Sequence, residues 1–305
     1  MSSYLFIGME VAGYACLKAL IEAGMPPAAV ITLDEAFCDR IIAFRSFRDL
    51  DNGEIPFYYV EKLNAPTQIE LIRHLAPQLI VTAYWSEMLP PDILAIAPLG
   101  CIGLHGTKLP KHRGRAPIPW SIIFGLRRGG MTLFQLTTEP DSGAILAQAE
   151  YSIEAHDYAA TIYDRAAECA ASLMADVVPQ LLTGRHSPVE YPAYRLDYWK
   201  KREPADGFID WWMTSERIYD LIRALSHPFP GAYAMINGIK ITIWRATYDG
   251  QSNRLTAGET GAAPNGCVMV GSGCGVVTIL EMECDGRPLS AADFFQQFAS
   301  TPFYT

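Results

Sequence analysis

Residues 4–33, YLFIGMEVAGYACLKALIEAGMPPAAVITL, hold the pattern that decides the fold. Tyr4–Gly8 is a short apolar run, which is typical of a buried strand. A helical stretch is predicted over Ala12–Ala23, stopped by Gly24, and a second strand over Ala29–Leu33. A strand, a helix and a further strand in this order indicate two parallel strands joined by a crossover helix.

The same rhythm continues through the first half of the chain. Further strands are predicted at 55–60, 79–83, 101–105 and 131–136, and helices at 66–75 and 158–182. This order predicts an α/β, Rossmann-like domain with a mostly parallel sheet, in which ligands bind beyond the carboxyl ends of the strands. The glycines after the first strand, in FIGMEVAG, do not form a GxGxxG loop, so a dinucleotide cofactor is not supported.

The second half has a different character. A charged, aromatic stretch with Pro204 predicts a linker over 196–206. A helix at 215–225 is followed by short predicted strands at 233–236, 240–244, 267–270 and 275–282, separated by Gly, Asn and Asp. We therefore expect an N-terminal domain over 1–195 and a β-rich C-terminal domain over 207–305, the latter a small OB-like antiparallel β-barrel.

Composition excludes several functional classes. The 305 residues are 50% hydrophobic and 19% charged, as in a globular protein. A net charge of −9 does not indicate the positively charged surface that nucleic-acid binding needs, although 108–115 (KLPKHRGR) is locally basic. No apolar run of about 20 residues suits a membrane, and no basic leader precedes the first apolar run. Seven cysteines without a CxxC pair favour reduced thiols in the cytoplasm and no metal site.

Two polar residues lie at or just after the ends of predicted strands, where α/β proteins commonly have their functional residues. His105 ends a predicted strand, and Asp141 lies in the turn that follows the 131–136 strand. Singly, each has an ordinary structural explanation, as a packed histidine and as a favoured turn residue. Together they indicate a carboxylate that orients an imidazole acting as a general base or acid. A GxSxG nucleophile motif and a helical pair of metal-binding histidines are both absent from the sequence.

Four stretches resemble the folate-dependent formyltransferases: GCIGLHGTKLPKHRGRAPIPW, MTLFQLTTEPDSGAILAQ, DGFIDW and IRALSHPFPGAY. This family includes methionyl-tRNA, glycinamide ribonucleotide and sugar N-formyltransferases, and HRGRAP and HPFPGAY look most similar to the sugar branch. The resemblance runs in order over about residues 4–250. It implies that the N-terminal domain binds 10-formyltetrahydrofolate and transfers its formyl group to an amine.

The resemblance also implies which residues act. The family core is Asn-x-His-x-Ser/Thr-x-Leu-Pro with a distant Asp, and His105, Thr107, Leu109 and Asp141 match it here. His105 would take the proton of the attacking amine, and Asp141 would fix its tautomer. The tetrahedral oxyanion that forms then needs a hydrogen-bond donor.

The sequence departs from the family at one catalytic position. Gly103 stands where the family has the Asn that supplies most of the oxyanion's hydrogen bonding. Losing one such donor typically costs about 100- to 1000-fold in rate. Three interpretations are open: protonated His105, a backbone N–H or a water replaces the donor; a different one-carbon or acyl group is transferred; or the protein binds folate without transferring formyl.

The binding residues follow from the resemblance as well. The pterin loop corresponds to Tyr84, Trp85, Ser86, Glu87, Met88, Leu89 and Pro90, with Leu109 beside it. The acceptor is expected near Gly8, Met9 and Glu10, and its phosphates near Lys111, Arg113 and Arg115, with Arg202 and Asp206 as further candidates. The structural alternatives are a loop with core aromatics and ion pairs with the domain's own acids.

The acceptor is predicted by elimination. Methionyl-tRNA is disfavoured because 237–305 contains only four Lys and Arg residues. A purine ribonucleotide is disfavoured because the single-domain relatives that use it lack the C-terminal domain. A nucleotide-linked amino sugar is expected, with an amino-acid or carrier-linked amine as the alternative, and a folate-binding protein without activity as the non-enzymatic one. Homodimers are common among relatives, and the sequence does not decide this point.

Overall fold

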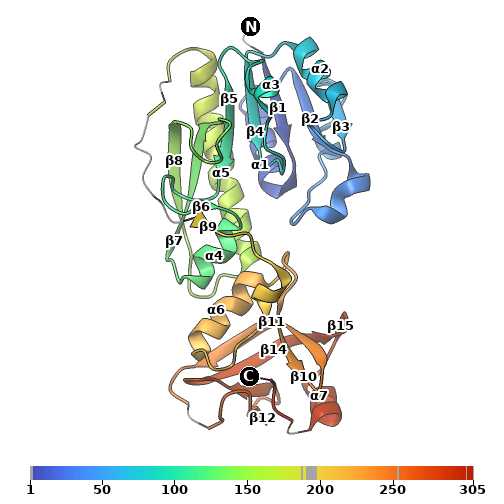
Figure 1. Ribbon diagram of the computed structural model, residues 1–305, viewed down its shortest axis with the longest axis vertical. Coiled ribbons are helices and arrows are strands. Elements are labelled where there is room, and N and C mark those ends of the chain that lie inside the picture. The colour runs from blue at the N-terminus through green and yellow to red at the C-terminus, as the bar shows by residue number, and fades with distance from the viewer. Residues whose placement is uncertain (1–2, 187, 190–197, 253, 300, 305) are drawn as a thin grey trace. The chain divides into compact units, whose positions relative to one another are not determined.

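The computed structural model describes residues 3–186, 188–189, 198–252, 254–299 and 301–304 (Figure 1). The chain divides into two compact units. The first comprises Met1–Pro117, Arg128–Ser152 and Tyr163–Lys200, and the second Ile118–Arg127, Ile153–Ile162 and Lys201–Thr305. The second unit thus includes two segments that lie inside the range 1–195 predicted for the N-terminal domain.

The first unit is built on a sheet that has seven strands among the described residues, in the order β3-β2-β1-β4-β5-β7-β8. The strands are β1 (Tyr4–Gly8), β2 (Ala29–Leu33), β3 (Phe57–Val60), β4 (Leu79–Ala83), β5 (Cys101–His105), β7 (Arg128–Gln135) and β8 (Ile145–Ser152). β1 to β5 pair in parallel, whereas β7 and β8 are antiparallel. The predicted mostly parallel α/β sheet is confirmed.

The edge strand β8 is not among the predicted strands. Its sequence, ILAQAEYS, mixes Ala, Gln and Glu with apolar residues and has no clean alternation. It exists because β7 provides a full ladder of partners, from Arg128 opposite Ser152 to Phe134 opposite Ile145. Pairing supplied by the tertiary structure therefore overrides a weak local pattern.

The helices of the first unit are α1 (Glu10–Glu22), α2 (Pro66–Leu75), α3 (Pro91–Leu94) and most of α5 (Ala159–Leu182), whereas α4 (Pro117–Ile123) belongs almost wholly to the second unit. Ile72 of α2 and Ile93 of α3 pack into one buried cluster with Ile7 of β1 and Ile80 of β4. Among the described helices, none is both long and apolar enough to cross a membrane.

The order of the central strands positions the site. β1, β4 and β5 lie side by side (Figure 1), with Gly8 opposite Ala83 and Thr82 opposite Gly103. The loops that leave these strands therefore start from one edge of the sheet, at the strands' carboxyl ends. They carry the residues predicted to bind acceptor and folate, beside the predicted base.

Part of the predicted linker belongs to the first unit. β9 (Tyr198–Trp199) pairs in parallel with β6 (Arg113–Gly114), and the two residues before it, 196 and 197, lie outside the described residues. Gly114 has a φ of +113°, and a Cβ there would lie 2.2 Å from the carbonyl oxygen of Trp199. Only glycine fits this close approach of two backbones. The turn η3 (Pro204–Gly207) belongs to the second unit.

The second unit is an antiparallel sheet with helix α6 (Ser215–Leu225). In the described part of the unit the order is β10-β11-β14-β13-β12, with β15 paired to β14. The strands are β10 (Ala232–Ile236), β11 (Ile239–Asp249), β12 (Thr260–Ala262), β13 (Val268–Gly271), β14 (Val276–Cys284) and β15 (Arg287–Pro288). The antiparallel character and the bounds of α6 agree with the prediction, whereas β12, β15 and α7 (Ala291–Phe298) are additional elements.

Candidate active site

His105 and Asp141 meet at the end of β5. The Nδ1 atom of His105 lies 3.3 Å from Oδ1 of Asp141. Asp141 has a φ of 52° in the turn between β7 and β8, and its Oδ2 accepts a hydrogen bond from the N–H of Gly114 at 3.3 Å. The structure thus brings together the two residues that the sequence paired, from strands that are neighbours in the sheet.

The surroundings of His105 favour a neutral ring. Burial lowers the pKa of His105 below its ordinary value of 6.5, since the ring is only 8% exposed, and the nearby Arg113 lowers it further. Asp141 acts in the opposite direction and favours the tautomer with the proton on Nδ1. That tautomer leaves a lone pair on Nε2, which faces the carbonyl oxygen of His112 at 3.4 Å. A hydrogen bond to this carbonyl requires a proton on Nε2, so the contact raises the pKa of His105, as Asp141 does.

Thr107 organises the loop that follows β5. Its hydroxyl donates to the carbonyl oxygens of Lys111 at 3.0 Å and His112 at 3.2 Å, and it is 3% exposed. Its own carbonyl accepts a hydrogen bond of 2.7 Å from the hydroxyl of Thr132. A side chain with these bonds closes the loop and shapes the environment of His105.

Two residues that the sequence reasoning missed support the same loop. Thr132 of β7 accepts a hydrogen bond from the N–H of Leu109 at 3.0 Å. Gln148 of β8 donates to the carbonyl of Leu109 at 2.6 Å and to the Thr132 hydroxyl at 2.9 Å. Leu109 itself is 2% exposed, so its side chain is core. A threonine inside the otherwise largely apolar stretch 131–136 was the signal available in the sequence.

The space beside Gly103 is filled. Gly103 and His105 are two residues apart on β5 and therefore point to the same face of the sheet. A Cβ on Gly103 would lie 2.6 Å from Cδ2 of Leu136, which itself packs against the core. The position where the family's amide is expected therefore adjoins an apolar side chain, and a larger residue needs Leu136 to move.

The start of α1 contributes one ionisable group. Glu10 has a φ of 66°, in the left-handed region that non-glycine residues rarely adopt. Burial raises the pKa of its carboxyl from 4.5 to about 8. The carboxyl is close enough to Tyr84 and Tyr163 to contribute to the raised pKa of each phenol. The neighbouring Met9 is 1% exposed and belongs to the core.

The segment Tyr84–Pro90 is held by its own side chains. Glu87 accepts hydrogen bonds from the N–H of Leu63 at 2.7 Å and from the indole of Trp85 at 3.2 Å. Leu89 is 6% exposed and packs in the core with the strands. Met88 is 53% exposed. The aromatic residues of this loop, Tyr84 and Trp85, are only partly buried, and Trp85 packs against the core. A loop that is held in place in this way can still present its main-chain groups to a pterin, so the structural and the binding interpretations are compatible.

The basic residues fall into two groups. Lys108 forms an ion pair of 2.7 Å with Glu150, which also binds Arg128 at 3.1 Å. Lys111 and Arg115 are exposed, whereas Arg113 is partly buried. An ion pair therefore accounts for Lys108. The role of Lys111, Arg113 and Arg115 in binding phosphates stays a prediction.

The two candidates from the predicted linker are engaged locally within the second unit. Arg202 donates to the carbonyl of Asp206 at 2.6 Å and lies 4.7 Å above the ring of Trp120. The carboxylate of Asp206 accepts from the N–H of Glu203 at 2.8 Å. Nothing in these contacts connects either residue with His105.

Metal-binding geometry is not found in the part of the chain that the structure describes. Within those residues no group of three or more His, Cys, Asp or Glu side chains is arranged to hold a metal ion.

Comparison with known proteins identifies the fold and the family. A formyl transferase model matches residues 28–178, and a model of the formyl transferase C-terminal domain matches residues 201–299. Over 235 residues the chain is 34% identical to the bifunctional polymyxin resistance protein ArnA of Wigglesworthia glossinidia brevipalpis. That alignment covers 77% of this chain and 36% of ArnA, so the chain spans about a third of that relative's length.

Solved structures show the same fold. A variant of HypX from Aquifex aeolicus matches 98% of this chain and 49% of its own, with a TM-score of 0.68 and 18% identity. An N-formyltransferase from Helicobacter canadensis, in complex with folinic acid and dTDP-3-aminofucose, matches 92% of this chain and 99% of its own, with a TM-score of 0.65 and 14% identity. With both family models matched in order along it, the chain belongs to the formyl transferase family.

Proposed function

We propose that the protein transfers a formyl group from 10-formyltetrahydrofolate to the amine of a small acceptor, a nucleotide-linked amino sugar. The observation that carries the proposal is the buried contact between His105 and Asp141 at the carboxyl end of β5. Family membership supports the reaction class, and the Helicobacter canadensis structure supports the acceptor, since that protein was solved with folinic acid and an amino sugar nucleotide.

The reaction needs a base at the attacking amine. The amine nitrogen bonds to the formyl carbon and gives up a proton, which Nε2 of His105 accepts while Asp141 stabilises the imidazolium. The tetrahedral intermediate then collapses, the bond to N10 of the folate breaks, and N10 leaves with a proton returned by His105. Because burial lowers its pKa, His105 is in the basic form before the reaction starts.

The oxyanion requires a donor other than a side chain at position 103. Gly103 has no amide, and Leu136 occupies the adjoining space. We assign this role to the imidazolium of His105, which carries a proton once the amine has been deprotonated, together with a backbone N–H or a water. With this assignment the reaction is still a formyl transfer, and it uses His105, Thr107 and Asp141 without a side-chain amide at position 103.

The cosubstrate and acceptor use different loops. Tyr84–Pro90 would hold the pterin through main-chain groups, because Glu87 and Leu89 point into the fold and fix the loop. Glu10 would bind the acceptor amine, and a cation placed there would lower the raised pKa of its carboxyl. Lys111 and Arg115, both exposed, would meet the acceptor's phosphates.

One assay tests the proposal. Purified protein is mixed with 10-formyltetrahydrofolate and a panel of nucleotide-linked amino sugars and free amino acids, and release of tetrahydrofolate is followed. We expect turnover with an amino sugar nucleotide, a product heavier by one formyl group in mass spectrometry, and loss of turnover in His105→Ala and Asp141→Asn. His74→Ala, at an exposed histidine of α2, is the matched control.

Two outcomes would overturn the proposal. Folate binding without turnover on any amine would make the protein a folate-binding protein. A product of another mass would mean that a different one-carbon or acyl group is transferred.

A further inference from the structure

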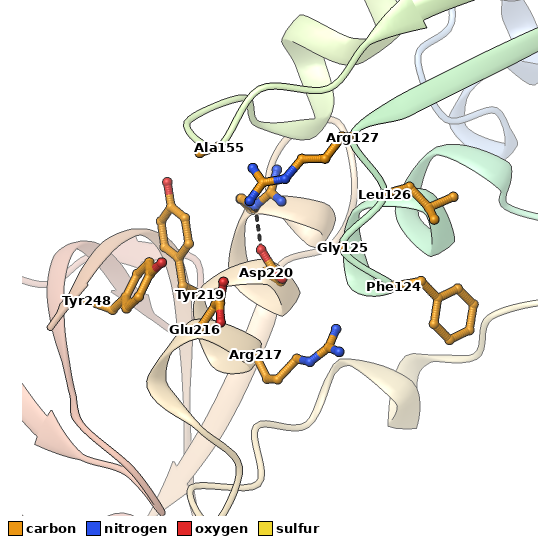
Figure 2. A pocket seen from close by; sticks show the side chains of 11 residues that line it. Phe124, Gly125, Leu126, Arg127, Ala155, Glu216, Arg217, Tyr219, Asp220 and Tyr248 are labelled. Atoms are coloured by element: carbon orange, nitrogen blue, oxygen red, sulfur yellow. Dashed lines mark hydrogen bonds and ion pairs between the residues drawn. The ribbon is translucent and has the colours of Figure 1, made fainter. Parts of the chain in front are cut away.

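A polar pocket of about 220 Å³ lies within the second unit (Figure 2). It is formed by the segment that follows α4, by the loop after β8, by one face of α6 and by the end of β11. Its walls are Phe124, Gly125, Leu126, Arg127, Ala155, Glu216, Arg217, Tyr219, Asp220, Arg223 and Tyr248. None of these residues has a part in the proposed formyl transfer.

A buried ion pair lines this pocket. Arg223 is 4% exposed, and its Nε lies 2.8 Å from Oδ1 of Asp220. The same guanidinium donates to the carbonyl oxygen of Asp157 at 3.0 Å. Burial raises the pKa of Asp220, and the charge of Arg223 opposes this rise. The pair is therefore fixed, and its two charges cancel.

Two further guanidinium groups reach the pocket from different segments. Arg217 of α6 donates through Nη1 to the carbonyl of Ile123 at 2.9 Å. This hydrogen bond holds the side chain, and the other N–H groups of the guanidinium can still donate to a ligand. Arg127 is exposed, and the described part of the chain gives it no ion pair. Against them stands one carboxylate, that of Glu216. The pocket thus has one positive charge in excess, in a chain of net charge −9.

The opposite side is aromatic. The rings of Tyr219 and Tyr248 lie 5.2 Å apart between centroids at 38°, and Figure 2 shows both beside the pocket. Tyr219 is 7% exposed, held edge-on by Tyr158 at 6.3 Å, whereas Tyr248 is 42% exposed. This side is rigid and apolar with phenolic hydroxyls at its ends, so the pocket has one cationic and one aromatic wall.

We propose that this pocket binds a small phosphate-bearing molecule, with Arg127 and Arg217 on the phosphate oxygens. A guanidinium group can hydrogen-bond two phosphate oxygens at once, and Arg127 and Arg217 line this one pocket from separate segments. The volume is below the roughly 300–1000 Å³ of sites for drug-sized ligands, which favours a small ligand over a whole nucleotide. The negative charge of Glu216 repels phosphate and so limits the affinity of the pocket for it.

Isothermal titration of the full chain with inorganic phosphate, in chloride buffer and without folate or amine, tests the proposal. We expect saturable binding that weakens about tenfold in Arg127→Gln, since a hydrogen-bonded charge is lost. Arg217→Lys keeps the charge but loses the fork and is expected to weaken binding as well. Glu216→Gln is expected to tighten binding severalfold.

Two controls separate this site from others. Arg287→Gln and Arg254→Gln remove exposed arginines of the second unit that do not line the pocket, and both variants should bind phosphate as the parent protein does. Absence of saturable binding, or equal affinity in Arg127→Gln and the parent protein, would overturn the proposal. So would binding lost in Arg115→Gln and kept in Arg127→Gln. Circular dichroism verifies that each variant is folded.

Discussion

Two buried pairs of opposite character distinguish the units of this protein. In the first unit His105 and Asp141 are 3.3 Å apart, and in the second Arg223 and Asp220 are 2.8 Å apart. The first pair joins a strand end to a distant turn, whereas the second lies three residues apart on one helix. An imidazole can gain and lose a proton near neutral pH, and a guanidinium cannot. The first pair can therefore perform chemistry, and the second can only hold structure and charge.

The largest effect is expected at the titrating pair. His105→Gln should lower kcat/KM for formyl transfer by about 10²- to 10⁴-fold, because the amide cannot accept the amine's proton. Tetrahydrofolate release measures this loss, and urea unfolding should show a stability close to that of the parent protein. His74→Gln is the control and should leave both quantities unchanged. A loss of stability comparable to the loss of rate would mean that His105 is a packing residue.

Breaking the pair of Arg223 and Asp220 should lower the stability of the protein. Arg223→Met leaves Asp220 buried without its partner and should lower the free energy of unfolding by about 3–5 kcal/mol. The double variant with Asp220→Leu should recover most of this loss. Arg245→Met breaks an exposed pair with Glu281 and should cost no more than about 1 kcal/mol. Urea titrations measure both free energies of unfolding. An equal loss in Arg223→Met and Arg245→Met would contradict the expected difference between a buried and an exposed ion pair.

The half-buried Glu10 makes the stability of the protein depend on pH. Its pKa is raised from 4.5 to about 8, so the folded protein keeps a proton that the unfolded chain releases between these values. Stability therefore falls as pH rises through this window. Glu10→Gln should remove the fall and be more stable than the parent protein by roughly 2–4 kcal/mol at pH 9, with little difference near pH 4.5.

Denaturant titrations at several pH values measure this linkage. Glu22→Gln, at the exposed end of the same helix, is the control and should show no such trend. An advantage of Glu10→Gln that does not change with pH would show that the carboxyl is not the titrating group.

The smallest effect concerns Gly103. Gly103→Asn alone should not speed formyl transfer, because Leu136 lies where the new side chain must go. The double variant Gly103→Asn with Leu136→Ala should be about tenfold faster than Leu136→Ala alone if the amide then reaches the oxyanion. Comparing kcat in the three variants checks this. An unchanged rate in the double variant would mean that the existing donor is already sufficient.

Several features were predictable because they depend on local pattern. Apolar runs bounded by turns gave six of the strands in the first unit, and the bounds of α6 were predicted to the residue. His105 and Asp141 meet even though β7 runs antiparallel to β5, with Ile102 opposite Gln135 and His105 opposite Thr132, so the carboxyl ends of these two strands lie at opposite edges of the sheet. β8 could not be predicted in this way, because its residues form a strand only against β7. The support of the loop by Gln148 depends on the same pairing.

The sequence by itself determined the fold class and the family and suggested the pairing of His105 with Asp141, since apolar periodicity and the separate family motifs can be read along the chain. Only the tertiary structure decided that Leu136 stands beside Gly103, that Glu10 is a carboxyl of raised pKa, and that three arginines line one pocket in the second unit. Packing and desolvation act between residues far apart in sequence, and no local pattern encodes them.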